Sequence, residues 1–315
     1  EAYFKNNPIQ NIPTTKHILF IACGSSLHCA LAAKQWFQTH GILTTIEIAS
    51  ELRHTALPDL SNTLVVAISQ SGETADTLIS LEHILSKPHQ HSIAICNTPN
   101  STLTQLCDST LYVQAGPEIG VASTKAVTCQ LLTLYKLSLY LSKQSYLLDD
   151  QALAQAIENT LHNPTIPTIA ASVAKYKHII CIGKQQLFPI AQELALKLKE
   201  LSYIHAEGIA AGELKHGPLA LVDSSVLTIV LDSSNTPNIQ TCIDEIKARG
   251  GPVLIIGSEK TTAQNIQQIQ PAHIAPPLSI IMVNICCQLL AYHTADALET
   301  PIDKPRNLAK SVTVE

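Results

Sequence analysis

Apolar segments alternate with amphipathic segments along the whole chain. The apolar segments are short, rich in β-branched residues and apolar on both faces, a pattern typical of parallel strands covered on two sides. Helical periodicity fills the intervals, as in Leu27–Thr39 and Thr74–Leu85. The pattern predicts an α/β protein with doubly wound, parallel, five-stranded-type sheets flanked by helices. The predicted strands are His17–Cys23, Thr44–Ile48, Thr63–Ser69, Ser92–Asn97, Ser109–Val113, His178–Gly183, Val226–Leu231 and Pro252–Gly257.

One short motif occurs twice. Ala49–His54 reads ASELRH, and Ala211–His216 reads AGELKH. Each copy is preceded by a glycine and followed by a strand that ends in a polar residue, and the spacings are similar in the two copies. This agreement indicates duplication of one α/β unit. The predicted domains are residues 1–145 and 146–295, separated within the polar stretch from 142 to 150 and followed by a C-terminal tail, 296–315.

The composition is that of a globular protein, with 46% of the 315 residues hydrophobic and 14% charged. The formal net charge of -5 comes without clusters of Lys and Arg, which argues against a nucleic-acid partner. Nine cysteines are scattered without a CxxC pair, which favours buried thiols in a reducing cytoplasm. The thirteen histidines show no metal-ligand spacing, so neither a metal nor a cofactor is predicted.

The most apolar stretch runs from Leu278 to Tyr292 and contains Asn284 and Gln288. A membrane-spanning helix needs about 20 apolar residues, and this stretch is shorter. It is therefore predicted to be a buried helix. No signal peptide is recognised ahead of it, and no membrane association is expected.

A hydroxyl-rich loop joins a predicted strand to a predicted helix. Ser69-Gln70-Ser71-Gly72-Glu73-Thr74 follows the apolar run 64–68 and directly precedes the helical run 75–85. Backbone N–H groups and the dipole at a helix N-terminus favour an anion, and Gly72 lets the backbone turn close to a ligand. Serine and threonine are also ordinary helix caps, so a plain cap is an alternative. Three hydroxyls at the carboxyl end of a parallel strand favour phosphate binding.

The equivalent place in the second copy reads Asp232-Ser233-Ser234-Asn235-Thr236. Asp232 puts an acid where an anion would have to approach, and the segment has no glycine. The sequence thus predicts that one copy has kept the phosphate site and the other has lost it.

Three charged residues recur at helical spacing between Pro189 and Ser202. Glu193, Lys197 and Glu200 share a face distinct from the apolar one. A solvated charge stripe is the ordinary interpretation, but the neighbouring residues are apolar, and buried charges need partners or a polar cavity.

His216 follows the small-residue run 208–212, which is interpreted as a loop passing close to a ligand. A single histidine is more often structural than catalytic. A phosphate anchor, a carboxylate and a histidine together, however, suit proton transfer between adjacent carbons of a sugar phosphate.

Several motifs match one known family. The turn Cys23–Ser26, the SQSGET loop and EIGVASTK at Glu118–Lys125 resemble the first sugar-isomerase (SIS) domain of glutamine–fructose-6-phosphate aminotransferases, also called glucosamine-6-phosphate synthases. LKE at 198–200, the segment His205–Pro218 and the tail PRNLAKSVTVE at 305–315 resemble the second domain and its terminal extension. The resemblance covers nearly the whole chain, and the tail is its most specific motif.

The resemblance implies a role for particular residues. Glu200 would be the base that moves a proton between C1 and C2, giving glucosamine 6-phosphate with ammonia or glucose 6-phosphate without it. His216 would assist ring opening from a neighbouring subunit, which implies a homodimer or a higher homo-oligomer. Lys197 and Lys310 would also serve the sugar end. The fructose 6-phosphate would be held at its phosphate by Ser26, Ser69, Gln70, Ser71 and Thr74, and at its sugar end by the backbone of Val121 and Ala309.

The sequence departs from the family in two places, because Gly183–Gln186 reads GKQQ where Gly-Arg-Gly-Asp is usual, and the inter-domain segment is short. The family's glutaminase half uses an N-terminal cysteine nucleophile, whereas residue 1 here is Glu. The chain is thus expected to be the isomerase half of a longer enzyme, with a glutaminase domain as its partner and no capacity of its own to release ammonia from glutamine.

Two other functions are open. A catalytically silent sugar-phosphate sensor would use the serine loop but would have no need of Glu200, His216 and Lys310 together. A sugar-phosphate deaminase or deglycase would share the general fold but not the ending PRNLAKSVTVE. The sequence favours the isomerase.

Overall fold

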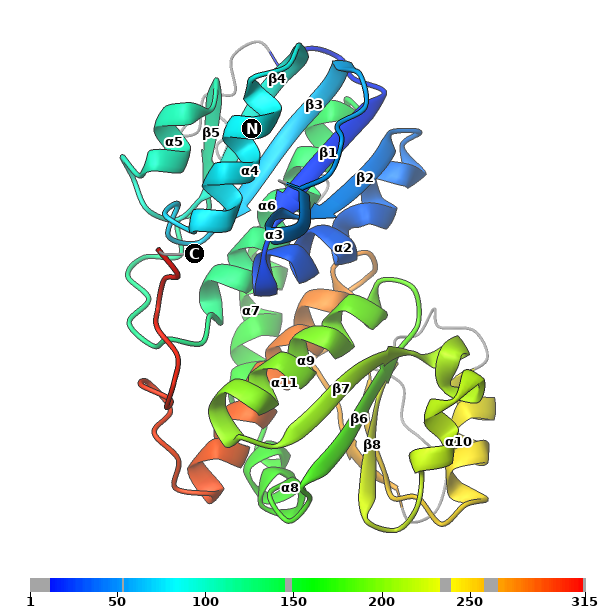
Figure 1. Ribbon diagram of the computed structural model, residues 1–315. Coiled ribbons are helices and arrows are strands. Elements are labelled where there is room, and N and C mark those ends of the chain that lie inside the picture. Colours follow the sequence, from blue (N-terminus) through cyan, green and yellow to red (C-terminus); the bar gives the residue numbers. More distant parts are fainter. Residues whose placement is uncertain (1–11, 53, 145–148, 233–238, 258–265, 314–315) are drawn as a thin grey trace. The chain divides into compact units, whose positions relative to one another are not determined.

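The computed structural model of the chain describes residues 12–52, 54–144, 149–232, 239–257 and 266–313 (Figure 1). The chain divides into two compact units, one formed by residues 1–147 with 309–315 and the other by residues 148–308. The domain boundary expected from the sequence, at 145 and 146, lies outside the described residues.

The first unit is a parallel five-stranded sheet in the order β2-β1-β3-β4-β5. Each strand passes to the next through a helical segment. The elements are β1 (His17–Ala22), α2 (Gly24–Thr39), β2 (Leu43–Ile48), α3 (Ala49–Leu52), β3 (Leu60–Ser69), α4 (Ala75–Leu85), β4 (His89–Cys96), α5 (Thr102–Leu106), β5 (Ser109–Tyr112) and α6 (Lys125–Leu141).

The second unit is also a parallel five-stranded sheet, in the order β7-β6-β8-β9-β10. Its elements are α7 (Asp150–Leu161), α8 (Thr165–Val173), β6 (His178–Gly183), α9 (Leu187–Ser202), β7 (His205–Ala210), the 3₁₀ turns η1 (Ala211–His216) and η2 (Pro218–Leu221), β8 (Val226–Asp232), α10 (Ile239–Lys247), β9 (Val253–Gly257), β10 (Gln267–Ile269) and α11 (Ser279–Ala297).

The two sheets have the same topology. In each, the second strand along the chain lies at one edge, the first beside it, and the third, fourth and fifth follow in turn. The repeated sequence motif falls at the same place in both, because α3 and η1 each begin directly after the second strand. The structure therefore confirms the α/β class and the duplication.

The prediction of a ligand-facing loop at 208–212 was wrong in part. Residues 205–210 form β7, an edge strand that pairs with β6. A Cβ on Gly208 would lie 2.4 Å from the Cα of Gln192, so this glycine lets α9 pack directly on β7. The strand β10 was also missed, because only three residues of it pair with β9.

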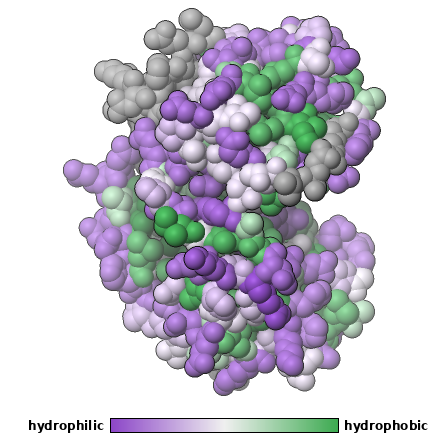
Figure 2. Space-filling model, turned by 60° about the vertical axis from the view of Figure 1, so that its left-hand side comes forward, coloured by the Kyte–Doolittle hydropathy of each residue, from purple (hydrophilic) through white to green (hydrophobic). Residues whose placement is uncertain are grey.

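The apolar helix expected between 278 and 292 is confirmed as a core helix. α11 has the length and composition of a membrane span, but 67% of its most apolar window is buried inside the protein. It packs against α7, α8 and α9 within the second unit. On the face shown in Figure 2, apolar side chains form separate patches among polar ones.

Candidate functional site

The serine loop turns sharply between β3 and α4. Gly72 has a left-handed backbone with φ of 70°, and the place of its missing Cβ is taken by Ser101 and Cys96. Glycine is thus required at this position because a side chain would collide with Ser101 and Cys96, whether or not a ligand binds the loop. The Gly72 N–H donates to Ser69 Oγ at 3.0 Å, and Ser69 Oγ lies 2.9 Å from Thr74 Oγ1.

The loop is not an ordinary capping turn. Thr74 is the N-cap of α4, yet its side chain makes no capping hydrogen bond to the helix. Glu73 instead fastens the loop to α5, accepting from the N–H of Thr102 at 2.7 Å and from its hydroxyl at 2.8 Å. Hydroxyl groups and helix N–H donors held this way are suited to an anion such as phosphate.

Two further expected ligands of the phosphate lie in the first unit. Ser26 sits in the first turn of α2, nearly buried, and accepts from Gln130 Nε2 of α6 at 3.2 Å. Gln70 follows the end of β3 and is partly buried; its carbonyl accepts from the N–H of Asn97 at 3.2 Å. Both residues are therefore anchored by the sheet or its covering helices.

The C-terminal residues 309–313 belong to the first unit and contact this same loop. Ser311 Oγ lies 3.1 Å from Ser71 Oγ, and the carbonyl of Val312 accepts from the N–H of Ala75 at 3.0 Å. Lys310 Nζ donates to Glu118 Oε2 at 2.6 Å. The two residues that follow Lys310 are thus bonded to the serine loop and to the start of α4, while Lys310 itself is bonded to Glu118.

In the second unit, α9 carries a buried cluster of charges. Lys197 Nζ donates to Glu200 Oε2 at 2.5 Å and lies 3.4 Å from Glu193 Oε1. The side chains of Lys197 and Glu193 are 2% and 1% exposed, and that of Glu200 is 20% exposed. The solvated stripe is therefore excluded, and Glu200 is the member that reaches the surface.

The charge state of Lys197 follows from this geometry. Burial alone would lower the pKa of its ammonium group, but the carboxylates of Glu193 and Glu200 outweigh burial, and the pKa is raised. Lys197 is thus a fixed cation beside a partly exposed carboxylate.

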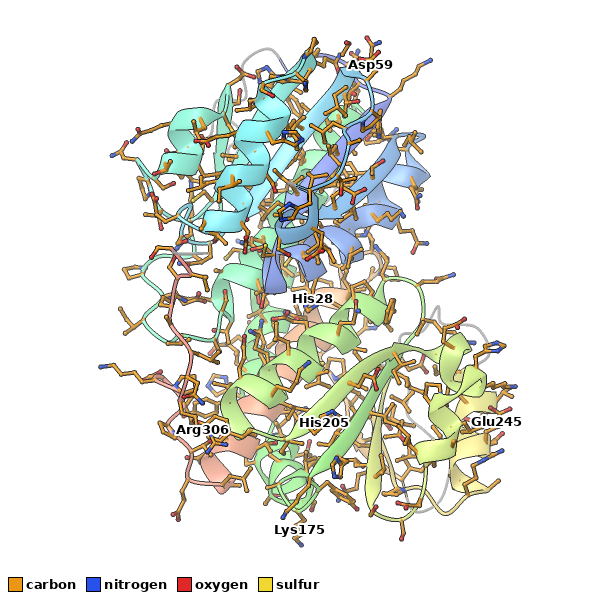
Figure 3. All side chains as sticks on the ribbon, viewed as in Figure 1. His28, Asp59, Lys175, His205, Glu245 and Arg306 are labelled. Atoms are coloured by element: carbon orange, nitrogen blue, oxygen red, sulfur yellow. The ribbon has the colours of Figure 1, made fainter. Side chains whose placement is uncertain are left out.

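The remaining candidates lie on other segments. His216 is exposed and ends η1, a turn that Lys215 ties to α10 through an ion pair with Glu245 at 2.6 Å (Figure 3). Val121 is partly buried in the segment before α6, and Ala309 is exposed. Among the described residues, no group of three or more His, Cys, Asp or Glu side chains could hold a metal ion.

The segment that leads to the tail is fixed to the end of α9. The N–H of Arg306 donates to the hydroxyl of Tyr203 at 2.9 Å, and its guanidinium lies 4.1 Å from the centre of the Tyr203 ring (Figure 3). The hydroxyl of Thr300 donates to the carbonyl of Leu201 at 2.6 Å. Sequence reasoning gave Tyr203 no role.

Two contacts went unrecognised in the sequence. Glu118 stood within a matched motif, but no residue nearby indicated its pairing with Lys310. Glu193 was placed on the charged face by its spacing, and only the structure identifies it as a second carboxylate on Lys197.

The second-copy loop after Asp232 lies outside the described residues.

Comparison with known proteins assigns the chain to a family. The family model described as the SIS domain matches residues 12–139 and 172–295, one match in each unit. The chain belongs to the SIS family. Each matched segment contains one of the two sheets, and the two sheets have the same strand order.

Relatives of this chain are named glutamine–fructose-6-phosphate aminotransferase (isomerizing). A glutamine–fructose-6-phosphate aminotransferase (isomerizing) of Pseudomonas syringae is 42% identical over 317 residues, which cover 95% of this chain and 52% of that protein. The chain therefore spans about half the length of the curated relatives it matches.

Solved structures agree at the level of the fold. The C-terminal domain of glucosamine-fructose-6-phosphate aminotransferase from Francisella tularensis is 36% identical, with a TM-score of 0.85, over 92% of this chain and 87% of that one. A glucosamine-6-phosphate deaminase from Thermotoga maritima has a TM-score of 0.76 at 23% identity over 99% of this chain and 95% of that one, which shows a shared fold alone.

Proposed function

We propose that this chain is the isomerase portion of a glutamine–fructose-6-phosphate aminotransferase, acting on fructose 6-phosphate. The names of its relatives support this assignment, at 42% identity over nearly the whole chain. The observation that carries it is the charge cluster of α9, in which a buried ammonium holds a partly exposed carboxylate. A sugar-phosphate sensor would have no use for such a cluster.

The substrate phosphate would bind at the serine loop. Ser26, Ser69, Gln70, Ser71 and Thr74 would supply hydroxyl and amide donors, and the N-terminus of α4 adds its dipole. The first domain, 1–145, would thus anchor the substrate, while the second, 146–295, would carry the acid–base residues and the tail, 296–315, would complete the site.

Glu200 would act as the base. It would take the proton from C1 of the open-chain ketose and return it to C2, and a cation nearby would stabilise the enediolate formed between the two steps. Lys197 suits this second role because its raised pKa keeps it protonated. Without ammonia the product would be glucose 6-phosphate. Ammonia would condense with the C2 carbonyl and release water, and the same transfer of a proton from C1 to C2 would then give glucosamine 6-phosphate.

The other residues would handle the ring and the sugar end. His216, exposed on η1, would assist ring opening in the site of a neighbouring subunit, which makes a homodimer or larger homo-oligomer part of the proposal. Lys310 and the backbone of Val121 and Ala309 would contact the sugar. A glutaminase domain would supply ammonia in the complete enzyme, and a reducing cytoplasm would suit the nine free cysteines.

A coupled assay tests the proposal. Purified protein should convert fructose 6-phosphate to glucose 6-phosphate, and Glu200→Gln should abolish turnover while calorimetry still detects binding of the sugar phosphate. Glu207→Gln, which alters an exposed carboxylate on β7 of the same unit, is the matched control and should retain turnover. Wild-type protein that binds the sugar phosphate without turnover would support the sensor instead, and wild-type turnover by Glu200→Gln would overturn the assignment of the base.

A further inference from the structure

Glu118 is a buried carboxylate in an exposed stretch of chain. It lies between β5 and α6, flanked by the exposed residues Pro117 and Ile119, yet its own side chain is only 4% exposed. Three donors converge on it, because Oε1 accepts from the N–H of Thr124 at 2.9 Å and of Ala126 at 3.1 Å, while Oε2 accepts from Lys310 at 2.6 Å. Its two oxygens therefore serve different partners.

One oxygen caps a helix. α6 has no acidic residue in its first turn, and its N-cap, Thr124, makes no side-chain capping bond. Glu118 supplies an acceptor and a negative charge at this end from outside the helix, where N–H groups and the dipole favour both. The carboxylate is therefore held in place independently of the tail.

The other oxygen faces the tail lysine. An ammonium group on a flexible four-carbon side chain loses considerable rotamer freedom when it is fixed. A carboxylate that is already fixed reduces that cost, because only one of the two partners must be ordered. Lys310 is 27% exposed and docks on an anion that α6 has positioned.

We propose that Glu118 is a positioning residue, which holds Lys310 so that its ammonium group meets the sugar end of the substrate whose phosphate the serine loop binds. This inference rests on the proposed function, in which Lys310 serves the sugar end. The tail contacts agree with it, because the two residues after Lys310 bond Ser71 of the serine loop and Ala75 at the start of α4. The pKa of Glu118 agrees as well, since burial would raise it but the hydrogen bonds from Lys310, Thr124 and Ala126 lower it.

The two roles of Glu118 can be separated by Glu118→Gln. The amide oxygen of glutamine can still accept from Thr124 and Ala126, so the cap on α6 remains, but the anion for Lys310 is lost. We expect kcat for fructose 6-phosphate isomerisation to fall about tenfold to a hundredfold, the size of one hydrogen bond to a charged group. KM should change less than about threefold, and the thermal midpoint near neutral pH should fall by only about 2–4 °C, because the cap on α6 is kept. Asp108→Asn removes a carboxylate bonded to Ser92 rather than to the tail and should leave kcat unchanged.

A double-mutant comparison tests whether Glu118 acts through Lys310. In a Lys310→Met background, Glu118→Gln should have no further effect on kcat beyond about twofold, because the partner is already absent. An undiminished effect in that background, or a wild-type kcat for Glu118→Gln alone, would overturn the proposal.

Lysine labelling tests the contact without any assay of turnover. With an amine-reactive acetylating reagent and mass spectrometry, Lys310 should be several-fold more reactive in Glu118→Gln than in the wild type, while the exposed Lys125 should be unchanged. Equal labelling of Lys310 in both proteins would overturn the positioning role. If Lys310 is less reactive in the wild type than in Glu118→Gln but the wild type shows no isomerisation, the proposed function fails while the Glu118–Lys310 contact stands.

Discussion

In the first unit, the helix after the first strand buries a neutral face, made of small and aromatic residues between Ser26 and Phe37. In the second unit, the corresponding helix α9 has the same length but buries a carboxylate and an ammonium group beside a second, partly exposed carboxylate. The first unit instead has the serine loop after its third strand. The same strand order thus supports two different polar clusters, and in the proposed function each unit carries a different part of the reaction.

The largest expected effect is that of removing the cation of α9. Lys197→Met leaves Glu193 and Glu200 close together in a buried site, and removing one partner of a buried ion pair costs about 3–5 kcal/mol. We expect loss of turnover and a destabilised second unit in scanning calorimetry. Lys34→Met, at the same ordinal position of α2 and partly exposed, is the matched control and should cost less than about 0.5 kcal/mol. Equal costs would contradict the contrast between the two helices.

The next effect concerns how α9 is seated on its sheet. Gly208→Ala would place a methyl group 2.4 Å from the Cα of Gln192, so helix and strand must separate, at a cost of about 1–3 kcal/mol. Gly212→Ala has nothing within 4 Å of the new methyl group and should be nearly neutral. Urea unfolding of the two variants measures the difference. A neutral Gly208→Ala would contradict the close packing of α9 on β7 at this glycine.

A smaller effect is expected at the serine loop. Thr74→Val removes a hydroxyl that lies 2.9 Å from Ser69 Oγ, with little change in shape. Affinity for fructose 6-phosphate should fall about tenfold, the loss of one hydrogen bond to an anion. Calorimetric titration measures it, with Thr39→Val at the exposed end of α2 as the control. Unchanged affinity would mean that the loop does not hold the phosphate.

The smallest effect is a difference in pH dependence between the two ion pairs. The pKa of Glu118 is lowered, so its contribution is present above the ordinary carboxyl value of about 4.3 and is lost as pH falls through the folded-state pKa. The pKa of Lys197 is raised, so its contribution is present below about 10.4 and is lost as pH rises through the folded-state pKa. Thermal unfolding from acid to alkaline pH should show Glu118→Gln flattening only the acid limb. A change in the alkaline limb would be the contrary result.

Local signals were sufficient for most of the fold. The segments 18–22 of β1 and 64–68 of β3 are continuous apolar runs buried on both faces, and such runs can be recognised without tertiary information. β7 could not be recognised, because an edge strand with His205, Glu207 and Gly208 lacks that pattern, and its identity depends on pairing with β6.

The candidate site was predictable only in part, for a similar reason. Lys197 and Glu200 are three positions apart on one helix, so spacing alone brought them together. Glu118 and Lys310 are 192 positions apart, and no periodicity connects them. The loop at 69–74 was predicted to be an anion site from its hydroxyls, and that stays a prediction; its fastening through Glu73 to Thr102 was not predicted.

The attachment of the C-terminal segment has a consequence for biosynthesis. Thr300 and Arg306 bond Leu201 and Tyr203, residues made about a hundred positions earlier, and Lys310 reaches back further still. Because translation proceeds from the N-terminus, both sheets can form on the ribosome before these contacts exist. A chain that ends before Thr300 can thus contain every strand described above. It still lacks the hydrogen bonds that the C-terminal segment makes to the end of α9 and to the serine loop.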